Sequence, residues 1–259
     1  MPIAKIPGLQ INYRLDGPLG APTLALSNSL GATLAMWDPQ IASFARTFRV
    51  LRYDTRGHGQ TAATPGEYSI ELLAADVLAL LDTLKIDSLH FCGLSMGGMI
   101  GMWLAANAPL RIGKLVLCNT AAKIGSPETW NPRIAAVKKD GMPGVASVVI
   151  ERWFTPEFRS SHPAAVASAQ KMLQDTDPHG YASACAAVRD FDFREKLAGI
   201  RAPTLVIAGA LDPVTPPADG KILAREIPAA DYVELNAAHL SNIGDAERFN
   251  AEVCAFLKR

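Results

Sequence analysis

Apolar residues along this chain fall into short runs that suit strands, separated by longer stretches with the spacing of helices. The short runs are rich in β-forming residues and are bounded by turn-forming residues. They predict strands over 11–15, 23–27, 49–53, 88–92, 114–118, 204–208 and 231–235. Strands buried on both faces have such continuous apolar runs, and the helices between them form crossover connections. The pattern predicts an α/β fold, with a mostly parallel sheet covered by helices on both faces.

Helical periodicity is clearest in the stretch that follows Ser69. Serine is favoured at the N-cap of a helix, because its hydroxyl accepts a hydrogen bond from a free backbone N–H. Apolar residues then recur at three- and four-residue steps: Ile70, Leu73, Val77, Leu80 and Leu84. This spacing predicts an amphipathic helix. The range 246–257 has a similar apolar stripe and predicts another helix.

The strand pattern stops between residues 121 and 197. Ala-rich helical stretches in this interval are interrupted by prolines: Pro127, Pro132, Pro143, Pro156, Pro163 and Pro178. An interval of this length inside a compact domain is more often a functional lid than a simple connection. We therefore predict a helical cap over 123–195, inserted between two strands of a core that comprises 1–122 and 196–259.

The composition is that of a globular protein with a sizeable core. Of the 259 residues, 49% are apolar and 19% are charged, so disorder is not expected. Lys plus Arg and Asp plus Glu both total 25, which gives a formal net charge of zero. Nucleic acids and anionic membranes attract proteins with an excess of basic surface, so we expect neither as a partner.

The sequence also bears on location. Residues 1–16 lack the charged and apolar regions of a secretory signal, and no apolar run is long enough to cross a bilayer. The cysteines have neither CxxC nor metal-ligand spacing: Cys92, Cys118, Cys185 and Cys254. We therefore expect a soluble protein of the reducing cytoplasm. Nothing in the sequence specifies an oligomeric state.

The sequence Gly93-Leu94-Ser95-Met96-Gly97 fits the pattern G-x-S-x-G, between the predicted strand 88–92 and a predicted helix over 96–106. A serine at such a junction has a strained backbone that projects its hydroxyl, and it needs small neighbours. A glycine-rich turn with an incidental serine would also match the five residues. The strand and the helix on either side favour Ser95 as a nucleophile.

A serine hydroxyl needs a base, and the base needs an acid that orients it. For a serine at such an elbow the expected chain order is serine, acid, histidine. His239 is the one histidine after the predicted cap, and it comes just after a predicted strand. Asp212 follows the predicted strand 204–208 and is the candidate acid. An acid one strand earlier is the alternative, but that position holds the uncharged Asn119.

Acyl transfer also requires donors for the oxyanion that forms at the carbonyl. The backbone N–H of Met96, directly after Ser95, is the first candidate. The second is the N–H of Leu30, in the loop after the predicted strand 23–27. Hydrolases of this type often have His-Gly in that loop, whereas this chain has Ser-Asn-Ser-Leu-Gly over 27–31. A backbone donor does not depend on the side chain that it carries.

These features together resemble the α/β-hydrolase superfamily over nearly the whole chain. The resemblance rests on Asp-Thr-Arg-Gly-His-Gly at 54–59, Gly-Leu-Ser-Met-Gly-Gly at 93–98, Gly-Ala-Leu-Asp at 209–212 and the late His239. We interpret 54–59 as structural and assign it no chemistry. More narrowly, the chain is similar to the 3-oxoadipate enol-lactonases of bacterial aromatic catabolism, on shorter motifs: 27–31, Glu-Arg-Trp-Phe-Thr-Pro at 151–156 and Arg-Asp-Phe-Asp at 189–192.

The resemblance to enol-lactonases implies a small lactone substrate with a carboxymethyl arm, and water as the second substrate. No cofactor or metal is expected, because the chain has no metal-ligand pattern or phosphate-binding loop. A substrate carboxylate requires a cation, and arginine can bind it through two hydrogen bonds. In the predicted cap, Arg133 stands close to Trp130 and Arg152 stands beside Trp153. Of the two arginines we predict Arg133 as this group, with Trp130 and Trp153 as walls of the pocket. The alternative is that the arginines lie in solvent and the tryptophans pack between helices.

Other functions fit the same residues. A broad carboxylesterase or a cofactor-free perhydrolase has the same triad and differs in its cap and pocket. An acyltransferase needs an acceptor site, of which the sequence gives no sign. A ligand-binding receptor with this fold is a third class, and the filled catalytic positions argue against it.

Overall fold

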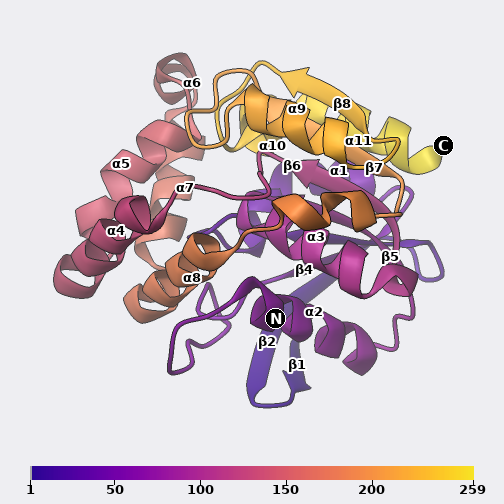
Figure 1. Ribbon diagram of the computed structural model, residues 1–259, viewed down its shortest axis with the longest axis horizontal. Helices are drawn as coiled ribbons and strands as arrows, with labels where there is room; N and C mark the ends of the chain where they lie inside the picture. The colour runs from indigo at the N-terminus through magenta and orange to yellow at the C-terminus, as the bar shows by residue number, and fades with distance from the viewer. Residues whose placement is uncertain (1) are drawn as a thin grey trace.

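The computed structural model describes residues 2–259 and contains an eight-stranded sheet in the order β1-β2-β4-β3-β5-β6-β7-β8 (Figure 1). The strands are β1 (Ile3–Ile6), β2 (Leu9–Asp16), β3 (Thr23–Ser27), β4 (Arg49–Tyr53), β5 (Leu89–Leu94), β6 (Ile112–Cys118), β7 (Thr204–Gly209) and β8 (Asp231–Leu235). From β4 to β8 all neighbouring strands are parallel, whereas β2 pairs antiparallel with both β1 and β4. The predicted mostly parallel sheet is confirmed.

The strand β1 is the one strand that the apolar pattern does not predict. It has four residues whose exposure alternates, and it pairs with β2 across a tight turn at Gly8. Only its two inward side chains, Ala4 and Ile6, join the core. So short a run carries too little periodicity to be recognised from sequence.

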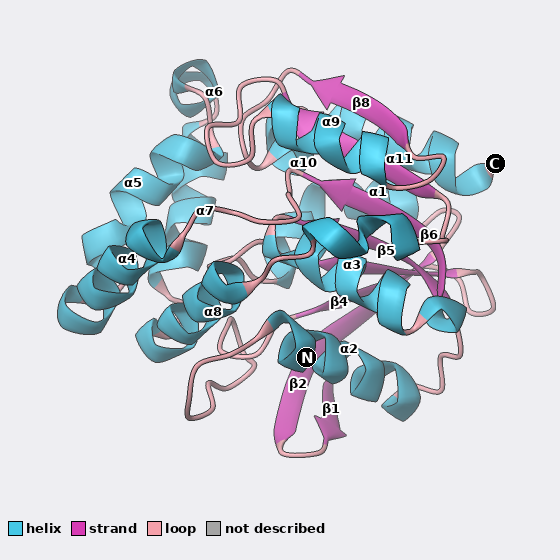
Figure 2. Cartoon of the chain, viewed as in Figure 1, coloured by secondary structure: helices cyan, strands magenta, loops and turns pink. Residues whose placement is uncertain are grey.

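Helices cover both faces of the sheet, as Figure 2 shows. The core helices are α1 (Asp38–Phe44), α2 (Ile70–Thr83), α3 (Met96–Asn107), α9 (Pro217–Glu226), α10 (Ser241–Gly244) and α11 (Ala246–Lys258), with short turns η1 (Leu34–Trp37), η2 (Pro109–Arg111) and η3 (Arg194–Gly199). Helix α2 packs against α3, and α1 packs against α11. The predicted N-cap is present, since Ser69 Oγ accepts a hydrogen bond from the Leu72 N–H at 3.1 Å.

A second group of helices stands between β6 and β7 in the chain and lies at one end of the molecule (Figure 1). These are α4 (Pro127–Asp140), α5 (Pro143–Trp153), α6 (Pro156–Ser161), α7 (Pro163–Gln174) and α8 (Pro178–Asp190). Each begins with a proline, which tolerates the first helical position because the N–H there has no helical partner. The prolines therefore mark helix starts, except Pro132, which lies inside α4.

Two further observations concern the predictions from composition. The four cysteines are free thiols, and Cys92 and Cys118 lie side by side on β5 and β6 with sulfurs 3.8 Å apart. Among residues 2–259, no helix is both long and apolar enough to span a bilayer.

Candidate active site

The turn between β5 and α3 holds Ser95 in an unusual backbone conformation. Its φ is 57° and its ψ is −115°, a region that residues other than glycine rarely occupy. Small neighbours are required here, because a Cβ at Gly93 would overlap the Gly97 carbonyl, and one at Gly97 would overlap the Ser27 carbonyl. The predicted strand–turn–helix junction and its strain are both present.

Asp212 and His239 are brought together by neighbouring parallel strands. Asp212 follows β7, His239 follows β8, and His239 Nδ1 lies 2.8 Å from Asp212 Oδ2. A carboxylate can only accept, so Nδ1 carries a proton, and in the neutral ring Nε2 is the nitrogen left free to accept one. This is the arrangement of a base oriented by an acid.

Asp212 keeps its charge although it is buried. Burial raises the pKa of a carboxyl, but the His239 ring and hydrogen bonds from Asn119 and Thr215 together lower the pKa of Asp212 below its ordinary value. Its other oxygen accepts from the N–H groups of Val214, at 2.8 Å, and Thr215, at 3.2 Å. A carboxylate held in this way can stabilise an imidazolium beside it.

Asn119 supports the pair, a role that sequence reasoning missed. It follows β6 with a φ of 43°, and its Nδ2 donates to Asp212 Oδ2 at 2.9 Å and to the Ala238 carbonyl at 3.2 Å. Ser241 Oγ donates to its Oδ1 at 2.5 Å. Asn119 stands where we considered an alternative acid, and it donates to Asp212, which follows the next strand of the sheet. The sequence feature that could have indicated this role is the position of Asn119 directly after the predicted strand 114–118.

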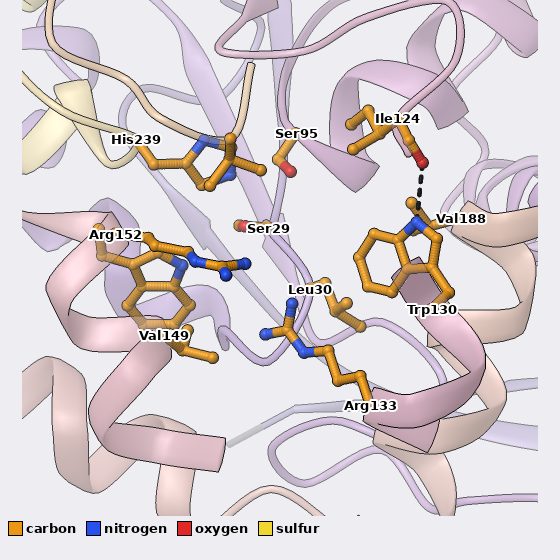
Figure 3. A pocket seen from close by; sticks show the side chains of 12 residues that line it. Ser29, Leu30, Ser95, Ile124, Trp130, Arg133, Val149, Arg152, Val188 and His239 are labelled. Carbon is orange, nitrogen blue, oxygen red and sulfur yellow. Dashed lines mark hydrogen bonds between the residues drawn. The ribbon is translucent and has the colours of Figure 1, made fainter. Parts of the chain in front are cut away.

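Ser95 and His239 line one pocket to which α4, α5 and α8 also contribute side chains (Figure 3). The pocket is lined by Ser29, Leu30, Ser95, Ile124, Trp130, Arg133, Val149, Arg152, Trp153, Val188, Val214 and His239. No hydrogen bond joins Ser95 Oγ to the His239 ring within the described residues. Such bonds are often long before substrate binds and tighten in the complex.

Two N–H groups of buried residues lie beside Ser95 without a protein acceptor among residues 2–259: those of Leu30 and Met96. Met96 is the first residue of α3, where backbone N–H groups have no helical partner and the helix dipole favours negative charge. Leu30 belongs to the segment 28–33 between β3 and η1, here named the β3 loop. Both groups are suitable oxyanion donors.

The helices α4 and α5 contribute two guanidinium groups to this pocket. Figure 3 shows that the side chains of Arg133, from α4, and Arg152, from α5, both extend into the middle of the pocket that Ser95 and His239 line. Arg133 packs between the rings of Trp130, at 5.3 Å, and Tyr181, at 5.4 Å. From sequence we favoured Arg133 over Arg152, and the structure places both on the pocket.

The predicted wall residues also line the pocket. Trp130 and Trp153 are both nearly fully buried, and Trp130 Nε1 donates to the Ile124 carbonyl at 2.7 Å. A wider chamber of about 530 Å³ continues outward between α4 and α5 and shares both arginines. Among residues 2–259, no three His, Cys, Asp or Glu side chains are close enough together to hold a metal ion.

Comparison with known proteins agrees with this architecture. A family model described as the alpha/beta hydrolase fold matches residues 22–246. The chain belongs to the α/β-hydrolase family, and it is a hydrolytic enzyme.

Within that family, the chain is similar to proteins named enol-lactonases. It is 43% identical to 3-oxoadipate enol-lactonase 2 of Acinetobacter baylyi, over 96% of this chain and 93% of the relative. It is 39% identical to 3-oxoadipate enol-lactonase 1 of the same organism, over 97% and 94%. The crystal structure of the enol-lactonase from Burkholderia xenovorans LB400 superposes with a TM-score of 0.98 at 48% identity, covering 100% of both chains. The resemblance recognised from sequence is confirmed.

Proposed function

We propose that this protein opens the ring of 3-oxoadipate enol-lactone, or of a close analogue that carries a carboxylate, in the catabolism of aromatic compounds. The observation that carries the proposal is the pair of cations, Arg133 and Arg152, on the pocket that Ser95 and His239 also line. A neutral ester would gain nothing from them, whereas a carboxylate would be bound by charge-assisted hydrogen bonds. The similarity to named enol-lactonases supports the same substrate class.

The first half of the proposed reaction forms an acyl-enzyme. His239 Nε2 takes the proton of Ser95 Oγ, and this oxygen attacks the ring carbonyl carbon. The carbonyl oxygen becomes an oxyanion and accepts hydrogen bonds from the N–H groups of Leu30 and Met96. The bond between that carbon and the ring oxygen then breaks, and the ring oxygen leaves as an enolate. An enolate is a better leaving group than an alkoxide, so breaking the bond needs little acid catalysis. The departing oxygen then takes from His239 the proton that came from Ser95, which gives the enol and leaves the imidazole neutral.

The second half returns the enzyme to its starting state. Water, deprotonated by His239, attacks the acyl carbon, and the bond to Ser95 Oγ breaks as His239 returns the proton to that oxygen. The product has a new carboxylate and an enol, which tautomerises to the keto acid. Throughout, Asp212 holds the His239 ring and stabilises its cationic form.

The substrate's own carboxylate sets its orientation in the proposed complex. Arg133 and Arg152 come from the cap, on the opposite side of the pocket from the Ser95 turn, so they bind the arm while the ring carbonyl faces Ser95 (Figure 3). Trp130 and Trp153 exclude water from the ring. Fixing the reactants in this way converts binding energy into orientation.

The test supplies 3-oxoadipate enol-lactone and follows the loss of its ultraviolet absorbance. The parent should open the ring, and Ser95→Ala should be slower by about 10⁶-fold in kcat, as for triad nucleophiles in general. A fluorophosphonate probe should label the parent and not the variant. Preference for p-nitrophenyl esters over the lactone in kcat/KM would replace the proposal with a broad esterase. A Ser95→Ala variant as fast as the parent would remove Ser95 from the mechanism.

A further inference from the structure

The turn at residues 54–59 has no part in the proposed reaction, yet two of its side chains hold the segment that carries the Leu30 N–H. His58 Nε2 lies 2.9 Å from the Gly31 nitrogen, and Asp54 Oδ1 lies 2.8 Å from the Leu34 nitrogen. Both are acceptors of a backbone N–H. The turn therefore holds the β3 loop by hydrogen bonds at Gly31 and at Leu34, the residue that follows the loop.

Each nitrogen of the His58 ring makes one hydrogen bond, and the two partners fix which nitrogen is protonated. Its Nδ1 lies 3.1 Å from the Arg56 carbonyl oxygen, which can only accept, so Nδ1 carries the proton. Nε2 is then unprotonated and accepts from Gly31. Burial, the largest influence, lowers the pKa of His58, while the Arg56 carbonyl and the carboxylates of Asp54 and Asp177 act against it. The ring is therefore neutral, as an acceptor must be.

The turn itself is firmly anchored. Arg56 donates to both oxygens of Asp76 on α2, at 2.8 Å and 2.5 Å. On the cap side the turn touches α8 so closely that a Cβ on Gly57 would lie 2.6 Å from the Gly180 Cα. His58 thus projects from a rigid support toward the β3 loop.

Gly31 is the residue next to the proposed oxyanion donor. Its φ is 79°, and a Cβ there would lie 2.9 Å from the Tyr181 ring, so the chain passes the cap without a side chain. A hydrogen bond on the Gly31 N–H fixes the peptide plane between Leu30 and Gly31. That plane limits how the preceding peptide, which carries the Leu30 N–H, can rotate.

We propose that His58 is a positioning residue that aims the Leu30 N–H at the oxyanion by accepting the Gly31 N–H. The proposal rests on the proposed function, because it requires Leu30 to be an oxyanion donor. His58 does not touch the substrate. It acts on the transition state through the β3 loop, so its removal lowers kcat and leaves ground-state binding nearly unchanged.

Two variants of similar size separate this role from packing. His58→Leu fills the space without an acceptor, and His58→Gln retains an acceptor oxygen near the position of Nε2. With p-nitrophenyl acetate, kcat of His58→Leu should fall by about 10- to 100-fold, with KM changed by less than about threefold. His58→Gln should recover most of the loss. The exposed His162, changed to Gln, is the control and should match the parent.

A trifluoromethyl ketone gives a second readout, because its adduct with Ser95 carries an oxyanion. Its affinity should fall in parallel with kcat in His58→Leu. If kcat of the folded His58→Leu variant stays within about twofold of the parent, or if His58→Gln is no better than His58→Leu at equal Tm, the positioning role is wrong.

A measurement on the parent needs no variant. In a nitrogen-15 NMR spectrum of histidine-labelled protein, Nε2 of His58 should have the shift of an unprotonated nitrogen, and a protonated Nε2 would overturn the proposal. Failure of the proposed function is distinguishable from both results. If the proposed function is wrong, the unmodified protein will react with fluorophosphonate and cleave p-nitrophenyl acetate but will leave the lactone intact.

Discussion

Asp212 is buried, and hydrogen bonds reach both oxygens of its carboxylate. Its neighbours are donors from three places in the chain: Asn119 after β6, Thr215 in its own turn and His239 after β8. A buried charge without such partners would be costly and would be neutralised by a shift in pKa. The convergence of donors is what allows an anion to persist beneath the imidazole.

Changing Asp212 to Asn should show how much the negative charge of Asp212 contributes to kcat. The amide has nearly the same shape but cannot stabilise the His239 cation, and it permits the wrong ring tautomer. We expect kcat to fall by about 10⁴-fold with little change in KM. Steady-state kinetics on p-nitrophenyl acetate and on the lactone will measure it. A loss below about tenfold on both substrates would exclude Asp212 as the triad acid.

The same variant tests the effect of pH on stability. Because the pKa of Asp212 is lowered in the folded protein, its carboxylate stabilises the fold above the ordinary carboxyl pKa of about 4. This contribution is lost as the pH falls through the lower, folded-state pKa. The difference in Tm between the parent and Asp212→Asn should therefore shrink as the pH falls below about 4. A difference that stays constant there would contradict the assigned shift.

At the scale of elements, the β5–α3 junction depends on close backbone contact. Helix α3 begins directly after Ser95, and Gly97 in its first turn faces the Ser27 carbonyl at the end of β3. The obstacle is backbone and not the movable end of a side chain. Any larger residue must push α3 away from the sheet and so displace both Ser95 and the Met96 N–H.

Changing Gly97 to Ala should therefore damage stability and activity together. We expect a loss of about 1–3 kcal/mol in unfolding free energy, as for overpacked sites, together with reduced kcat. Urea denaturation and p-nitrophenyl acetate kinetics will measure these. Gly199→Ala is the matched control, since no atom lies within 4 Å of a Cβ built there. Equal effects of the two substitutions would show that the contact at Gly97 is not restrictive.

At the scale of the whole molecule, the pocket is complete only where the cap meets the core. Ser95 and His239 come from loops at the carboxyl ends of core strands, and Arg133 and Arg152 come from α4 and α5. Ligand sites of open α/β sheets lie at this end of the strands. In the proposed complex, the core supplies the chemistry and the cap recognises the substrate's charge.

Removing one cation should therefore affect carboxylated substrates selectively. Arg133→Met removes the guanidinium that lies over the Trp130 and Tyr181 rings and keeps an unbranched apolar side chain. Arg152→Met is its counterpart on α5. Each should lower kcat/KM for the lactone by about 10- to 100-fold, the value of a charge-assisted hydrogen bond. Hydrolysis of the neutral p-nitrophenyl acetate should change by less than about threefold.

Lys138→Met is the matched control for these variants, because Lys138 is an exposed cation of the same helix as Arg133. It should leave both substrates unaffected. An unchanged kcat/KM for the lactone in Arg133→Met would remove that residue from the site, and the same holds for Arg152.

Much of this protein could be predicted from its sequence because the signals are local. Continuous apolar runs marked seven of the eight strands, and prolines marked the starts of the cap helices. The junction at Ser95 is recognisable because a strained turn between a strand and a helix requires glycine on both sides within five residues. Chain order then singled out Asp212 and His239.

Tertiary structure alone decided which distant side chains meet. The hydrogen bond from Asn119 to Asp212, the place of both Arg133 and Arg152 on one pocket and the hydrogen bond from Gly31 to His58 bring together residues with no local pattern between them. Each depends on the register of parallel strands, which brings loops far apart in sequence to one edge of the sheet, and on how the cap docks there. Periodicity reports only which face of an element is buried, and not which other element it will face.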